Sequence, residues 1–193
     1  MSTVPATHDE SGFSLIETII AMGILATGLL GLAGVFTLGM AHMATSSANL
    51  VAREKAREAV ESVHTARDTR TITWCQIYNV TEATKSAECA SAAPGVFLNG
   101  EKDLKDPGVD GLVNTADDAN EAIEKQPGPD GTLGTSDDVS MTNFKRTIEI
   151  SNLTQDDGTG INQDLRQIQV TITYNVGPVR RSYVLTTYIS RIS

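Results

Sequence analysis

The sequence predicts an α+β fold in which one long N-terminal α-helix packs on a C-terminal antiparallel β-sheet. Two observations lead to this fold class. An uncharged apolar stretch near the N-terminus passes into an amphipathic pattern of helical period, which predicts a single helix that ends near residue 68. Three stretches in the C-terminal third alternate apolar and polar residues, which predicts half-buried strands.

The apolar stretch is long enough to cross a membrane. From Thr18 to Ala41 there are 24 residues without a charge, and about 20 apolar helical residues span a bilayer core. The alternative, a buried helix of a soluble protein, is rarely apolar on every face, and an ordinary secretory signal has a shorter apolar core. The sequence therefore predicts a transmembrane helix over residues 13–41.

The helix continues as an amphipathic segment over residues 42–68. Small apolar residues such as Ala52, Ala56 and Ala59 recur at helical spacing, and charged residues such as Arg53 and Glu54 occupy other faces. At about 1.5 Å per residue, some 55 residues would form a helix near 80 Å long. The rest of the chain, residues 69–193, is predicted to form a globular head.

The predicted strands cover about residues 144–153, 165–175 and 180–190. The turn between the last two contains Val176, Gly177 and Pro178, so these strands form an antiparallel meander with one face free to pack on the helix. Residues 71–80 are rich in β-favouring side chains and fit either a strand or an irregular connector. Residues 86–95 are small and polar, which predicts a loop.

The chain contains two cysteines, Cys75 and Cys89. In a reducing compartment they would be two separate thiols, whereas in an exported protein a disulfide is favoured. Closing a loop of this size would contribute about 3 kcal/mol to stability.

Most of the net charge of −9 lies in one segment. Residues 101–138 hold eleven acidic residues and three lysines, and the remaining chain holds thirteen acidic and twelve basic residues. No basic stripe for nucleic acid is present in the sequence pattern, so no nucleic-acid partner is expected.

This acidic segment contains an internal repeat. Residues 106–118 recur as residues 126–138, with Pro, Gly, Asp, Gly, Thr, Asp and Asp at matching offsets. Closely spaced carboxylates between glycine turns offer the hard oxygen ligands that Ca²⁺ prefers. The spacing is not that of an EF-hand, and the segment resembles the Asp-Gly-rich Ca²⁺-binding repeats of extracellular bacterial proteins; the alternative is a solvated acidic loop. The predicted metal ligands are Asp110, Asp117, Asp118, Asp130, Asp137 and Asp138.

The segment Gly12-Phe13-Ser14-Leu15-Ile16-Glu17 precedes and enters the apolar helix. It resembles the class III signal of type IV prepilins and pseudopilins, and the glycine-rich stretch from Gly28 to Gly34 resembles PilV-type minor pilins in particular. Such leaders usually carry Lys or Arg, which residues 1–12 lack. Taken alone, Glu17 would also fit a carboxylate stabilised by the dipole at the helix N-terminus.

The resemblance implies three roles. Prepilin peptidase would cleave between Gly12 and Phe13, which removes residues 1–12 as a leader peptide. Phe13 would then be N-methylated. Glu17 would pair with the N-terminal ammonium of a neighbouring subunit, because an unpaired carboxylate is unfavourable in an apolar environment.

The resemblance also implies the pilin-like form of the fold and a function. The chain would be a minor type IV pilin, held in the inner membrane with a periplasmic head until it joins other pilins near the filament tip. The alternative is a minor pseudopilin of a type II secretion system. A membrane-anchored calcium-dependent adhesin is a further possibility that is compatible with the minor-pilin function. No Ser/His/Asp set, Cys/His set or phosphate loop is evident in the sequence, so we do not expect an enzyme.

Overall fold

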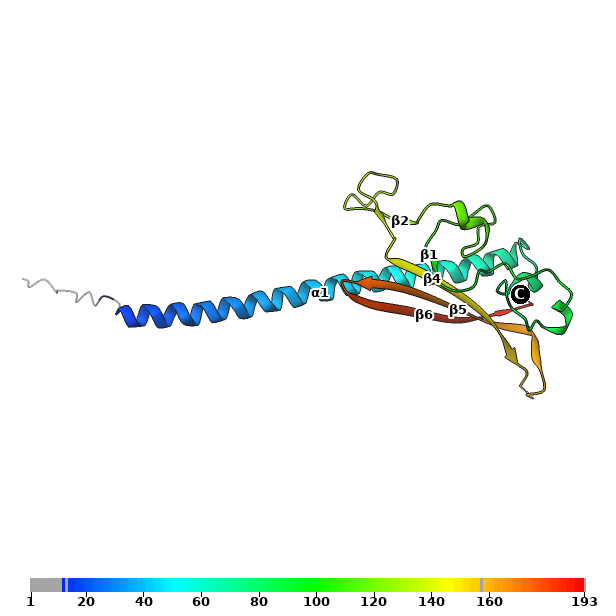
Figure 1. The fold of residues 1–193 in the computed structure, drawn as a ribbon, viewed down its shortest axis with the longest axis horizontal. Coiled ribbons are helices and arrows are strands. Elements are labelled where there is room, and N and C mark those ends of the chain that lie inside the picture. The colour runs from blue at the N-terminus through cyan, green and yellow to red at the C-terminus, as the bar shows by residue number, and fades with distance from the viewer. Residues whose placement is uncertain (1–11, 13, 157, 193) are drawn as a thin grey trace, which may run out of the picture. The chain divides into compact units, whose positions relative to one another are not determined.

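The structure is a computed structural model that describes residues 12, 14–156 and 158–192. The chain divides into two compact units, residues 1–44 and residues 45–193, and the second is called the C-terminal unit below. The predicted fold class is confirmed: a long helix, α1 (Leu15–Asp68), packs against a C-terminal antiparallel sheet (Figure 1).

Helix α1 ends where the sequence predicts. Its last turn carries Arg67, a cation that complements the partial negative charge at a helix C-terminus. Two residues beyond the end of the helix, Arg70 has φ 60°, which turns the chain away from the helix axis. Within the C-terminal unit, the helix presents a stripe of buried small residues: Ala52, Ala56, Ala59, Val63 and Ala66.

The main sheet has four strands in the order β1-β4-β5-β6, and all neighbours are antiparallel. The three predicted strands are confirmed as β4 (Phe144–Thr154), β5 (Ile161–Val176) and β6 (Val179–Ser190). Gly177, at φ 58°, makes the predicted tight turn between β5 and β6. The fourth strand, β1 (Lys102–Asp103), pairs with β4 at one edge.

One face of this sheet and the alanine stripe of α1 enclose the core. Ile168, Val170, Ile172 and Tyr174 alternate along β5 and are all buried, as their period of two predicts. Because alanine side chains are short, the helix backbone can lie close to these residues. The sheet thereby fixes the orientation of the exposed face of the helix.

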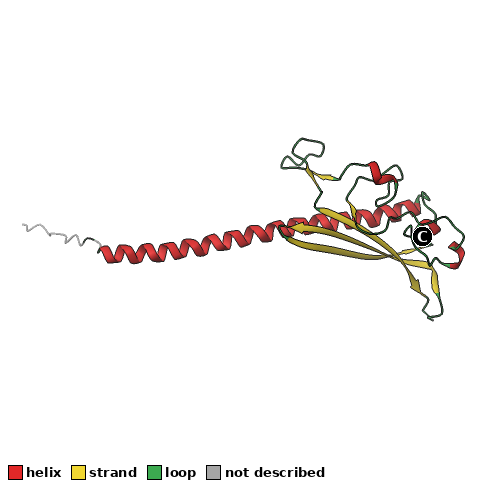
Figure 2. Cartoon of the chain, viewed as in Figure 1, coloured by secondary structure: helices red, strands yellow, loops and turns green. Residues whose placement is uncertain are grey.

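The connection between α1 and β4 is largely irregular (Figure 2). Residues 71–80 form a connector with one short 3-10 turn and not a strand, because Trp74–Gln76 adopt that turn. The predicted loop at residues 86–95 also contains a 3-10 turn. The acidic segment holds two further short elements, η3 (Asp117–Asn120) and β2 (Lys125–Gln126), and β3 (Val139–Ser140) follows it directly.

Candidate functional site

The predicted cleavage site lies just before α1. Gly12 is exposed, and Phe13 lies outside the described residues. Glu17 lies in the first turn of α1, is exposed, and forms no ion pair with any residue that the structure describes. Among the described residues, this carboxylate therefore has no cation partner.

No residue that the structure describes covers the N-terminal part of α1. Each residue from 14 to 43 is exposed, and α1 is long and apolar enough to cross a membrane, with a mean hydropathy of 2.3 in its most apolar window. A Cβ built on Gly28, Gly31 or Gly34 would meet no atom within 4 Å. These glycines are therefore not required by packing within the described chain, and they leave a surface that other helices can approach closely in lipid.

A disulfide joins Cys75 to Cys89, whose Cα atoms lie 5.2 Å apart. Arg166 lies beside it: its guanidinium carbon is 4.0 Å from the ring centroid of Trp74 and 3.6 Å from that of Tyr78. The guanidinium also donates to the carbonyl oxygens of Trp74 and Ile77. Burial lowers the pKa of Arg166 to about 10. The disulfide closes a loop within the connector after α1, and Arg166 attaches this connector to strand β5.

The two copies of the acidic repeat have the same local geometry. In the first copy, Asp117 accepts hydrogen bonds from the Thr115 hydroxyl (2.6 Å) and the Asp110 backbone N–H (3.3 Å). In the second copy, Asp137 accepts them from the corresponding Thr135 hydroxyl (2.5 Å) and Asp130 backbone N–H (3.3 Å). These hydrogen bonds lower the pKa of both Asp117 and Asp137.

The glycine that the two copies share as Gly108 and Gly128 lies very close to an aspartate carboxylate of its own copy. A Cβ on Gly108 would lie 2.3 Å from the Asp117 carboxylate, and a Cβ on Gly128 would lie 2.5 Å from the Asp137 carboxylate. Only glycine leaves room for the carboxylate at this offset. The sequence repeat is thus a repeat of one loop structure, closed by its own aspartates.

The surroundings of the two copies differ. The first copy packs on the core through Leu112 and Val113, which are buried. The second copy, between β2 and β3, exposes Leu133. The first copy is therefore part of the core of the C-terminal unit, and the second copy is a surface loop.

All six predicted metal ligands accept hydrogen bonds within their own copy of the loop. Among the described residues, no group of three or more His, Cys, Asp or Glu side chains is arranged to hold a metal ion. The calcium site thus stays a prediction.

Sequence reasoning missed a buried ion network. Glu124, in the acidic segment, lies 2.7 Å from Lys55 Nζ of α1 and 3.2 Å from Arg146 Nη1 of β4. Arg146 is fully buried and also donates to the Asn114 side chain. Burial lowers the pKa of Arg146. Burial also acts to lower the pKa of Lys55, but the hydrogen bonds from Lys55 to Glu124 and Glu58 outweigh it, so the pKa of Lys55 is raised. The sequence feature that could have indicated this network is Arg146, which occupies an inward-facing position of a predicted strand.

Comparisons with known proteins give one family. Residues 7–33 match the family described as "Prokaryotic N-terminal methylation motif". Comparisons with curated proteins and with solved structures gave no match. The matched residues contain Gly12, Phe13, Glu17 and the apolar start of α1, which are the features that the sequence singled out.

This motif is the class III signal that prepilin peptidase processes, and it is followed here by an uncovered apolar helix and a helix-on-sheet unit. These features are those of a structural subunit that is anchored in a membrane and assembled into a pilus-type filament. The chain therefore carries the prokaryotic N-terminal methylation motif, which supports a type IV pilin-like protein.

Proposed function

We propose that this chain is a minor type IV pilin of the PilV type, which takes part in pilus assembly at or near the filament tip. The methylation motif at residues 7–33 is the observation that carries the proposal. The glycine-rich stretch from Gly28 to Gly34 supports the minor class. A minor pseudopilin of a type II secretion system is the second candidate, since its N-terminal helix would be very similar.

The proposal assigns roles to the N-terminal residues. The Gly12–Phe13 bond is cleaved and Phe13 becomes the methylated N-terminus of the mature chain. Methylation retains the positive charge of the amine, so the ammonium of a neighbouring subunit can pair with Glu17. Glu17 has no cation partner among the described residues, which supports an external one. Before assembly, α1 anchors the chain in the inner membrane with the C-terminal unit in the periplasm.

Filaments sheared from cells that make type IV pili test this function. The wild-type chain should be recovered with the pili in few copies per filament, whereas Glu17→Ala should be processed but remain in the membrane fraction. Glu149→Ala removes an exposed carboxylate of β4 and serves as the control that enters normally. Recovery only with a secretion pseudopilus would favour the second candidate, and normal entry of Glu17→Ala would refute the pairing role.

We also propose that the acidic repeat binds Ca²⁺. Residues 101–138 carry an excess of eight negative charges, and a cation would reduce their mutual repulsion. Because the loop aspartates are held by backbone N–H groups, binding would require some of these hydrogen bonds to be exchanged for the ion.

Millimolar Ca²⁺ should therefore raise the melting temperature of the full chain in detergent relative to EDTA. The double variant Asp130→Asn/Asp137→Asn should reduce this rise, since the second copy is the exposed one. The same melting temperature and the same protease resistance in Ca²⁺ and in EDTA would reject the site.

A further inference from the structure

An arginine stands just after α1 at a position where the backbone favours glycine. Arg70 has φ 60°, and the residue that ends a helix with a positive φ is usually glycine, which adopts this conformation without steric cost. A larger side chain in this region is strained, and such strain is concentrated at functional sites. The conformation of the chain therefore does not account for the Arg70 side chain.

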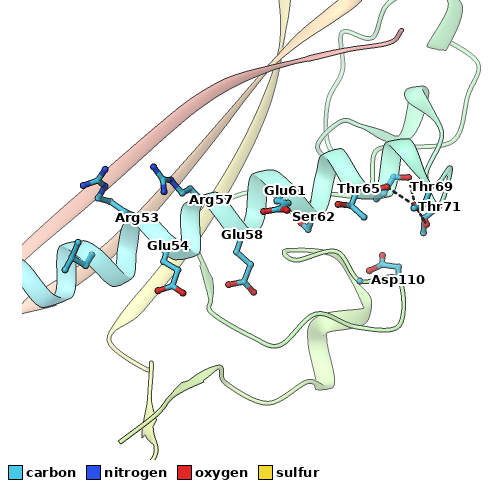
Figure 3. A pocket seen from close by; sticks show the side chains of 13 residues that line it. Arg53, Glu54, Arg57, Glu58, Glu61, Ser62, Thr65, Thr69, Thr71 and Asp110 are labelled. Carbon is cyan, nitrogen blue, oxygen red and sulfur yellow. Dashed lines mark hydrogen bonds between the residues drawn. The ribbon is translucent and has the colours of Figure 1, made fainter. Parts of the chain in front are cut away.

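The turn that holds Arg70 is fixed by its two neighbours. Figure 3 shows Thr69 and Thr71 side by side, with their hydroxyl oxygens hydrogen-bonded at 2.9 Å. The Thr69 hydroxyl also donates to the Thr65 carbonyl oxygen at 2.8 Å. Both neighbours line the groove along α1 that Figure 3 draws, whereas Arg70 lines a different pocket. The turn thus places Arg70 at this second pocket.

The second pocket is open and has a volume of about 380 Å³. This is within the range of small-molecule sites, roughly 300–1,000 Å³. Its lining combines charged, hydroxyl and aromatic residues, which include Arg67, Asp68, Arg70, Thr73, Trp74 and Arg191.

Two of the three arginines of this pocket already have carboxylate partners. Arg67 Nη2 lies 2.6 Å from Asp68 Oδ1, and Arg191 Nη1 lies 2.7 Å from Glu88 Oε2. Arg70 is exposed and forms no ion pair with any residue that the structure describes. Arg70 is therefore the cation of this pocket that is left to bind an anionic group of a ligand.

The indole of Trp74 is held in place beside this pocket. Trp74 is half-buried, and its Nε1–H donates to the Gln163 carbonyl oxygen at 3.1 Å. The guanidinium carbon of the buried Arg166 lies 4.0 Å from the centroid of the indole ring. These contacts fix the ring before a ligand binds, so its exposed part offers apolar contact area at a low cost in conformational entropy.

We propose that this pocket binds an acidic sugar, a pyranose ring that carries a carboxylate. The carboxylate of the ligand pairs with Arg70, since arginine can hold a carboxylate through two hydrogen bonds. A ligand hydroxyl donates to Asp68, and the apolar face of the sugar ring packs on Trp74. Nucleic acid is not favoured, because Asp68 and Glu88 would repel its phosphates. This binding goes beyond the proposed function and does not depend on the processing of the N-terminus.

Intrinsic fluorescence tests the proposal, because Trp74 is the one tryptophan in the sequence. The full chain, in a detergent without sugar groups and in EDTA, is titrated with short oligomers of galacturonic, glucuronic and mannuronic acid. EDTA prevents Ca²⁺ from joining these acids to the acidic segment. At least one oligomer should give a saturable change in fluorescence and should protect Trp74 from quenching by acrylamide. The neutral oligomer of the same sugar should bind about tenfold more weakly, since it lacks the carboxylate that pairs with Arg70.

Arg70→Gly separates binding from folding. This variant should bind the acidic oligomer about tenfold more weakly. The melting temperature of the unliganded variant should be equal to that of the wild-type chain or higher, because glycine relieves the strain at this φ. Arg181→Gln, which removes an exposed arginine of β6, is the matched control and should leave both binding and melting unchanged.

The proposal is overturned if none of the acidic oligomers binds, or if Arg70→Gly binds as tightly as the wild-type chain. Equally tight binding of inorganic phosphate or of an oligothymidylate would also overturn it, because the pocket would then recognise an anion without the sugar. A lower melting temperature of Arg70→Gly would give Arg70 a structural role and would remove the argument from strain on which the site depends.

Discussion

Glu124→Ala is expected to lower the free energy of unfolding of the C-terminal unit by about 3–5 kcal/mol. The substitution leaves the fully buried Arg146 without its carboxylate partner and also removes an ion pair from Lys55. Removal of one member of a buried pair is costly because the remaining charge cannot recover its hydration. Loss of this carboxylate therefore removes the ion pairs through which the acidic segment contacts α1 and β4.

Urea unfolding of the full chain in detergent measures this effect through Trp74, the one tryptophan in the sequence. Glu101→Ala is the matched control, since it removes an exposed pair with Arg180 and should change the free energy of unfolding by about 0–1 kcal/mol. Equal effects of the two substitutions would show that Glu124 is hydrated and not part of a buried network.

Replacement of both cysteines, Cys75→Ser with Cys89→Ser, is expected to lower the free energy of unfolding by about 3 kcal/mol. The disulfide closes a loop of the connector between α1 and the sheet, so its removal increases the freedom of the unfolded chain. The connector should then gain freedom first, although Arg166 and the indole N–H of Trp74, which donates to the Gln163 carbonyl oxygen, still attach it to β5.

Urea unfolding also measures the decrease in the free energy of unfolding of this double variant. The reductant dithiothreitol provides the control. Reduction of the wild-type chain should shift its unfolding midpoint to that of the double variant, and reduction of the variant should change nothing. A wild-type chain that is insensitive to reductant under unfolding conditions would contradict the stabilising role of the disulfide.

The long elements of the fold could be predicted from residue periodicity. The alternation along Ile168, Val170, Ile172 and Tyr174 gives the strand, its buried face and its approximate ends, because one face of the sheet must cover the helix. The strands of two residues, β1, β2 and β3, could not be predicted, since so few residues show no period.

Polar interactions between distant segments were the least predictable feature. Arg146 occupies an inward position of β4, but its partner Glu124 lies in an irregular segment 22 residues away. The acidic repeat was visible as a sequence repeat, yet its spacing alone did not show that the aspartates close their own loops. It also did not show that the first copy packs on the core through Leu112 and Val113 whereas the second exposes Leu133, because burial depends on what the rest of the chain places beside each loop.

The N-terminal methylation motif could be recognised from the sequence alone, and the family match covers it at residues 7–33. A glycine, an aromatic residue and a glutamate four residues later precede or enter an apolar stretch, so the motif is local in the sequence. Long-range packing is not needed to bring these residues together.

The central claim is that the chain is a prepilin processed between Gly12 and Phe13, and intact mass tests it most directly. The full chain is expressed with and without an active prepilin peptidase, and its mass is measured after extraction from the membrane. With the peptidase, the mass should equal that of the chain from Phe13 onward plus one methyl group; without it, residues 1–12 should be retained. Retention of residues 1–12 in the presence of an active peptidase would contradict the account.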